Sequence, residues 1–118
     1  MNGKFNLDKK FDEVSPSNCF ISEITLAELK FGVENSERKE KNREALHDFL
    51  SEVEVLPIFN SLDFYASEKA RLRKSGTPTE DFDLLIGATA VTNGLIMVTN
   101  NFNHFKGING IELKDWTK

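Results

Sequence analysis

Two short runs of apolar residues stand out along the chain, at residues 19–22 and 95–99. Continuous apolar runs of about four to eight residues are typical of strands that a parallel sheet covers on both faces. Two further segments, residues 53–58 and 111–116, alternate apolar with polar positions and indicate more peripheral strands. Pro57 fits only a sheet edge or a strand end. The pattern therefore predicts four strands.

Between these strands, apolar residues recur at helical spacing. The expected helices cover residues 25–34, 36–51, 61–75 and 77–93, with a short one near residues 7–14. Strands that alternate with helices indicate an α/β sandwich with a mostly parallel sheet. No repeat, low-complexity segment or Pro/Gly/Ser-rich linker divides the 118 residues, so we expect a single domain over residues 1–118.

Charge and composition limit the classes of function. A formal net charge of −4 gives no overall attraction to nucleic acid, so an RNA contact would need a local basic patch or metal ions that bridge to phosphate. Arg71, Arg73 and Lys74 form such a patch, but a helix dipole also favours cations at this end, and we interpret them as a solvated helix end. No apolar run approaches the ~18 residues that cross a bilayer, and no secretory signal is evident. We therefore expect a cytoplasmic protein without membrane contact.

Glu28 comes early in the helix that is expected to follow the first strand. Ligands of open α/β sheets bind at the carboxyl edge of the strands, which would place this carboxylate at a site. Thr25 and Glu28 also have the spacing of a capping box, in which Glu28 would serve only the helix N-terminus. The segment by itself favours the capping interpretation.

Asp83 is the only formally charged residue from Phe82 to Phe105. A cap, a first-turn proline and an N-terminal acid are already supplied by Thr77, Pro78 and Glu80. A carboxylate on an otherwise apolar helix is costly to bury unless it is paired, and no lysine or arginine stands three or four residues away. A divalent cation would satisfy Asp83, and the alternative is a distant arginine or backbone amides. Gly87 and Ala90 keep the same face small, which leaves room for another element or a ligand.

A polar turn at residues 99–105 follows the second apolar run. Turn chemistry explains its asparagines well, because asparagine bonds to its own backbone and tolerates left-handed conformations. Contacts of Thr99, Asn100 and Asn101 with a metal or a substrate are the weaker alternative. We interpret His104 as a surface or core-edge residue rather than a ligand or a base.

Together, three segments resemble the later motifs of PIN-domain ribonucleases of the VapC type. They are residues 21–32 (ISEITLAELKFG), 81–90 (DFDLLIGATA) and 98–101 (VTNN). The resemblance extends from about residue 5 to residue 116. It implies a PIN-like three-layer α/β sandwich and the toxin of a type II toxin-antitoxin system. It further implies an endoribonuclease that hydrolyses RNA phosphodiester bonds with Mg²⁺ or Mn²⁺ and that a small antitoxin protein neutralises.

Residue by residue, the resemblance assigns the second acidic position of the family to Glu28 and the third to Asp83. Both would be catalytic and metal-binding, and Asp81 would help as a further metal or outer-shell residue. Where many PIN domains carry a fourth acid, this chain has Asn101, as many toxins of this type do. Carboxylates would hold one or two hard cations, and the metal would generate hydroxide and stabilise charge on the phosphate.

The family opens with a strand that ends in Asp-Thr-Asn, and no such strand precedes Asn2. That strand is central in the family's sheet, whose order is 3-2-1-4-5. We therefore expect a sheet without its first central strand, little ribonuclease activity from these 118 residues alone, and homo-oligomers formed through open strand edges. The alternative is a catalytically inactive PIN-like module that still binds the antitoxin. A phosphoacceptor receiver would need an aspartate at the end of a central strand, and no predicted strand ends that way.

Overall fold

The computed structural model describes residues 19–99 and 101–115. The chain divides into two compact units, residues 1–56 and 57–118, and each has a hydrophobic core of its own. The single domain expected over residues 1–118 stays a prediction. The short helix expected near residues 7–14 lies outside the described residues.

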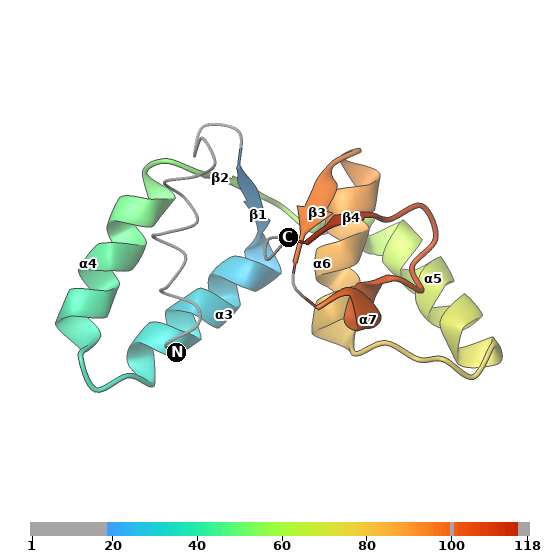
Figure 1. Cartoon of the computed structure of the whole chain (residues 1–118), viewed down its shortest axis with the longest axis horizontal. Coiled ribbons are helices and arrows are strands. Elements are labelled where there is room, and N and C mark those ends of the chain that lie inside the picture. The colour runs from blue at the N-terminus through green and yellow to red at the C-terminus, as the bar shows by residue number, and fades with distance from the viewer. Residues whose placement is uncertain (1–18, 100, 116–118) are drawn as a thin grey trace. The chain divides into compact units, whose positions relative to one another are not determined.

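The first unit joins two parallel strands through a pair of helices (Figure 1). Strand β1 (Phe20–Ser22) leads into α3 (Glu23–Glu34), and α4 (Lys39–Leu50) leads into β2 (Glu54–Leu56). The strands pair in parallel with Ile21 opposite Val55. The two helices pack through the buried side chains of Leu29, Val33 and Leu46. Both predicted strands are confirmed, and each is shorter than expected.

Helix α3 begins two residues earlier than predicted, and Ser22 is its cap. The Ser22 hydroxyl oxygen accepts a hydrogen bond of 3.0 Å from the backbone N–H of Thr25. Ser22 ends β1 with an extended backbone (φ −81°, ψ 160°), which is the conformation that an N-cap requires. Thr25 already lies inside the helix. The capping box of Thr25 and Glu28 is therefore wrong, and Glu28 is not needed for capping.

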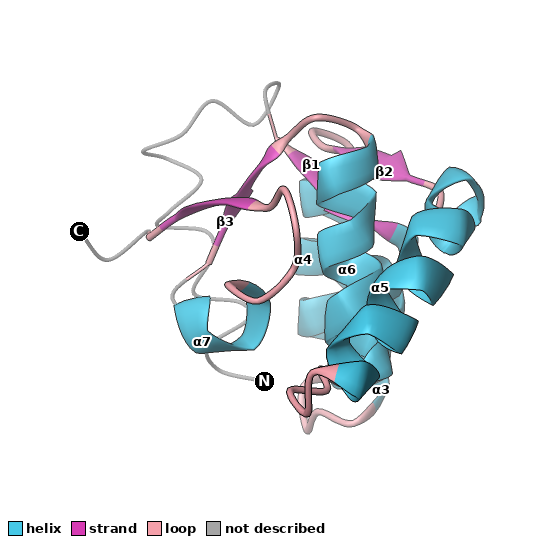
Figure 2. Ribbon diagram, turned by 90° about the vertical axis from the view of Figure 1, so that its right-hand side faces the viewer, coloured by secondary structure: helices cyan, strands magenta, loops and turns pink. Residues whose placement is uncertain are grey.

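In the second unit, two long helices lie side by side (Figure 2). A 3₁₀ turn, η2 (Phe59–Ser61), precedes α5 (Leu62–Lys74), which packs along α6 (Asp81–Thr92). Strands β3 (Ile96–Val98) and β4 (Glu112–Lys114) pair in parallel. Between them in sequence is α7 (Phe102–Phe105), a one-turn helix where only a polar turn was expected. The buried core of this unit consists of Leu72, Leu84, Phe105 and Ile108.

The structure pairs β1 with β2 and β3 with β4. In the order 3-2-1-4-5 that the resemblance implies, where the first strand is the one that ends in Asp-Thr-Asn, these pairs correspond to strands 2 and 3 and to strands 4 and 5. Among the described residues, each strand has one hydrogen-bonded neighbour. Ile96 and Val98 keep 58% and 41% of their surface exposed, so the described residues do not cover β3 on both faces. The parallel α/β pairing itself is confirmed. In the described part of the chain, no helix is both long and apolar enough to cross a membrane.

Helix α6 begins at Asp81, four residues later than predicted. Its N-cap, Glu80, makes no side-chain capping bond. Thr77 belongs instead to the end of α5, because its N–H donates to Leu72 O at 3.0 Å and its hydroxyl lies 2.9 Å from that of Ser75. The predicted cap at Thr77 is therefore wrong. Asp83 lies in the first turn of α6, where the helix dipole favours a negative charge.

Candidate active site

Asp83 has a hydrogen-bond partner of a kind that the sequence did not predict. Its Oδ2 lies 3.0 Å from Nδ1 of His104 on α7. The Asp83 side chain is 22% exposed and that of His104 is 54% exposed. A distant arginine or backbone amides were the expected alternatives to a metal, and neither is bonded to Asp83 among the described residues. His104 is at the surface, as predicted, but it also bonds to the candidate catalytic carboxylate.

This hydrogen bond uses one of the two carboxylate oxygens of Asp83. No hydrogen bond or ion pair reaches the other oxygen, Oδ1, from the part of the chain that the structure describes. Mg²⁺ and Mn²⁺ prefer oxygen ligands, and carboxylates that bind metals are themselves commonly hydrogen-bonded through their other oxygen. The environment of Asp83 therefore fits a hard divalent cation.

Glu28 lies in α3, half-buried, next to the core residue Leu29. It forms no hydrogen bond or ion pair with any described residue. Within the described part of the chain, neither capping nor pairing therefore occupies the Glu28 carboxylate. Within residues 19–99 and 101–115, no three side chains of aspartate, glutamate, histidine or cysteine are grouped so that they could hold a metal ion.

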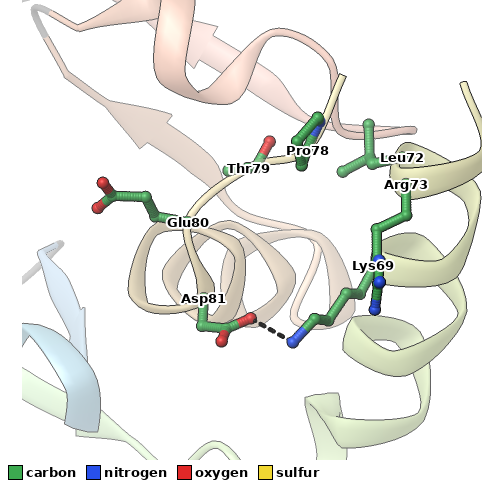
Figure 3. Close-up of a pocket in the computed structure, with 7 residues that line it drawn as sticks. All are labelled: Lys69, Leu72, Arg73, Pro78, Thr79, Glu80 and Asp81. Atoms are coloured by element: carbon green, nitrogen blue, oxygen red, sulfur yellow. Dashed lines mark ion pairs between the residues drawn. The ribbon is translucent and has the colours of Figure 1, made fainter. Parts of the chain in front are cut away.

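Asp81 is attached to α5 by two contacts. Its Oδ1 lies 2.8 Å from Nζ of Lys69 (Figure 3). The same oxygen accepts a hydrogen bond of 2.9 Å from the hydroxyl of Tyr65. The hydrogen bonds from Lys69 and Tyr65 hold the pKa of Asp81 below its usual value. Asp81 is therefore ionised, but Lys69 balances its charge. This arrangement suits the outer-shell role that the resemblance implies better than direct binding of a metal.

Beside this ion pair is a pocket of about 390 Å³, which includes both cationic and anionic side chains (Figure 3). Its lining consists of Lys69, Leu72, Arg73, Pro78, Thr79, Glu80 and Asp81. The two bases and two acids leave no net formal charge in the lining, so the pocket has no preference for an anionic ligand.

Among the described residues, the turn after β3 is closed by the side chain of Thr99 and by backbone groups, and neither a bond from the Asn101 side chain to the backbone nor a left-handed asparagine is found. Thr99 N–H donates to Lys114 O at 2.9 Å, and Thr99 Oγ1 accepts a hydrogen bond of 3.0 Å from the backbone N–H of Asn101. The carbonyl of Asn101 in turn accepts from the N–H of His104 at 3.1 Å. Asn100 lies outside the described residues. Thr99 and Asn101 thus shape the turn that presents His104, and their contact with metal or substrate stays a prediction.

The basic end of α5 is only partly a solvated helix end. Arg71 donates two hydrogen bonds, of 2.7 and 2.8 Å, to the carboxylate of the buried Glu68 and a third, of 2.7 Å, to Gly107 O. Glu68 also accepts a hydrogen bond of 2.8 Å from Asn109 N–H. The interpretation is therefore wrong for Arg71, which fixes the turn after α7. Arg73 and Lys74 are exposed, as expected.

Comparison with known proteins identifies the family. A family model described as "PIN domain" matches residues 4–110. The chain is 36% identical over 104 residues to the tRNA(fMet)-specific endonuclease VapC of Salmonella typhimurium. The aligned residues cover 87% of this chain and 79% of that protein. It is 38% identical over 99 residues to Ribonuclease VapC2 of Rickettsia felis. That alignment covers 83% of this chain and 74% of that protein.

Solved structures agree with this result. DNA-bound VapBC from Salmonella typhimurium matches with a TM-score of 0.84 and 35% identity, over 93% of this chain and 83% of that chain. VapBC2 from Rickettsia felis, bound to a promoter DNA fragment, matches with a TM-score of 0.80 and 34% identity, over 94% and 82%. The expected PIN-like α/β fold is thus confirmed. Because the similarity in sequence and in fold extends over most of its length, the chain belongs to the PIN-domain family, among the VapC ribonucleases.

Proposed function

We propose that this chain is a metal-dependent endoribonuclease toxin of the VapC type that hydrolyses RNA phosphodiester bonds in the cytoplasm. The observation that carries the proposal is the state of Asp83, the only charged residue in a long uncharged stretch. Its carboxylate is half-buried and hydrogen-bonded through one oxygen, while no described residue binds the other. The proposal is also supported by relatives that are named as nucleases and that align with most of this chain.

Asp83 and Glu28 would supply the carboxylate ligands of Mg²⁺ or Mn²⁺. When bound, such an ion supplies a hydroxide nucleophile near neutral pH and positive charge beside the phosphate. Asp83 would bind through Oδ1 while His104 holds Oδ2, and Glu28 would bind with a carboxylate that no described residue occupies. Because the chain carries a net charge of −4, a bridging cation would also offset its repulsion of RNA.

The proposal includes a small antitoxin as a partner, because the solved relatives are VapBC toxin-antitoxin structures. The same comparison is also compatible with the alternative, a catalytically inactive PIN-like module that binds the antitoxin, since it does not test the role of the two carboxylates. Self-association of the chain remains part of the proposal. Light scattering on the purified chain, alone and with an antitoxin, measures both assemblies.

Cleavage of a mixed RNA substrate tests the catalytic assignment. The variants are Glu28→Gln and Asp83→Asn, and the matched control is Asp63→Asn, which removes an exposed acid from the first turn of α5. Each is made both as the 118 residues and with an added N-terminal strand that ends in Asp-Thr-Asn, because the resemblance implies such a strand.

We expect the extended wild type and the extended Asp63→Asn variant to cleave RNA in the presence of Mn²⁺. EDTA should stop this cleavage, because it removes the cation. Glu28→Gln and Asp83→Asn should not cleave. Equal rates for extended Asp83→Asn and Asp63→Asn would refute the site. No cleavage by any extended form, together with retained antitoxin binding, would favour the inactive module.

A further inference from the structure

His104 approaches Asp83 from a firmly held position. It is the only side chain among the described residues that hydrogen-bonds to the Asp83 carboxylate. The next residue, Phe105, is 6% exposed and packs in the core with Leu72, Leu84 and Ile108. The backbone N–H of His104 is bound at 3.1 Å to Asn101 O. The ring of His104 is exposed, but the backbone that carries it is anchored.

The turn that follows α7 is held as well. Arg71 donates to Gly107 O at 2.7 Å, and Glu68 accepts from Asn109 N–H at 2.8 Å. Since Glu68 is buried on α5, these contacts attach the turn to a helix of the same unit. The segment that carries His104 is thus fixed by the core at Phe105 and by this turn. A rigid support of this kind is what a residue needs in order to orient another.

We propose that His104 is a positioning residue for Asp83, a role that rests on the proposed function of Asp83 as a metal ligand. Nδ1–H of His104 donates to Oδ2 and leaves Oδ1 for the cation. The terminal torsion of a free aspartate is broad, so an unheld carboxylate must lose that freedom when a metal binds. Hydrogen bonds from residues behind a metal ligand commonly contribute about 10- to 100-fold to metal affinity or activity.

Variants of His104 separate this role from simple attachment of α7 to α6. His104→Leu removes the donor, whereas the amide of His104→Asn can donate from near the position of Nδ1. The matched control is His47→Leu, which removes the other described histidine, exposed on α4. The readouts are the affinity for Mn²⁺ alone, by calorimetry at constant pH, and the melting temperature without metal. Asp83→Asn is measured alongside, and all variants are made in the extended chain.

We expect His104→Leu to weaken Mn²⁺ binding by about tenfold or more, His104→Asn to restore most of the affinity, and His47→Leu to match the wild type. Because the His104 ring is 54% exposed, the melting temperature should change little. If Asp83→Asn abolishes binding and His104→Leu does not weaken it, the positioning role is overturned while the metal site stands. If Asp83→Asn binds Mn²⁺ like the wild type, the proposed site fails and the role of His104 fails with it. If His104→Leu binds Mn²⁺ more weakly only because the variant is unfolded, as its melting temperature without metal would show, the positioning role is also overturned.

Discussion

Gly87 lies one turn after Asp83, where the segment that follows α7 packs against α6. A Cβ atom at Gly87 would lie 2.5 Å from Cδ1 of Ile108 and 3.4 Å from Cδ1 of Ile111. Carbon atoms in contact are about 3.5–4.0 Å apart, so Gly87→Ala forces the Ile108 side chain to move. Overpacking of this kind costs about 1–3 kcal/mol, and alanine recovers about 1 kcal/mol of helix propensity over glycine. We expect a net loss of about 1 kcal/mol in the free energy of unfolding.

A double-mutant cycle tests this contact. Ile108→Val removes the clashing Cδ1 and by itself costs about 1 kcal/mol. In the double variant the alanine Cβ occupies the vacated space, so we expect stability near that of the wild type and a coupling of about 2 kcal/mol. Urea denaturation of the four proteins gives these free energies. Effects that add within about 0.5 kcal/mol would show that Gly87 and Ile108 are not in contact.

Three further predictions follow from contacts elsewhere in the chain. Glu68→Gln should lower the free energy of unfolding by about 2 kcal/mol at neutral pH, because it replaces a buried carboxylate that accepts charge-assisted hydrogen bonds. The hydrogen bonds from Arg71 and from Asn109 N–H lower the pKa of Glu68, so its contribution is present above the unfolded pKa and lost as pH falls through the folded one. The difference in melting temperature between Glu68→Gln and the wild type should therefore become smaller in acid. A difference that does not change with pH would contradict this prediction. Ser22→Ala should cost about 1 kcal/mol through loss of the α3 cap, measured by urea denaturation, and an unchanged stability would refute that cap. Arg73→Glu should leave RNA retention in a low-salt filter assay nearly unchanged, and a large loss would show that this helix end binds RNA.

The elements that depend on local pattern could be predicted from the sequence. Short apolar runs identified β1 and β3. The small face at Gly87 left room for another element or a ligand, and the segment with Ile108 packs there. The start of α5 was predicted to within one residue, but the starts of α3, α4 and α6 were misplaced, because several residues compete to cap and distant contacts decide between them. Ser22 caps α3 where β1 ends, and Asp81 is bonded to α5 through Lys69.

The partner of Asp83 could not be found by examining its neighbours along α6. His104 is 21 residues away, and it reaches Asp83 because the burial of Phe105 forms a short helix in an otherwise polar turn. Arg71 was misjudged for the same reason, since its contact with Gly107 spans 36 residues. The sequence does show that His104 directly precedes the aromatic residue Phe105, which is part of the core, in the turn that follows the apolar run of β3. This position could have indicated that His104 is held in place.

The proposal that Glu28 and Asp83 bind the same cation is tested most directly by NMR on the isotope-labelled, extended chain. Mn²⁺ broadens the signals of nearby nuclei, so a substoichiometric titration reports which amides lie close to the bound ion. We expect the amides around Glu28 and those around Asp83 to broaden together, and neither group to broaden in Asp83→Asn at the same Mn²⁺ concentration. Broadening of only one group in the wild type, or of both groups unchanged in Asp83→Asn, would contradict a shared site.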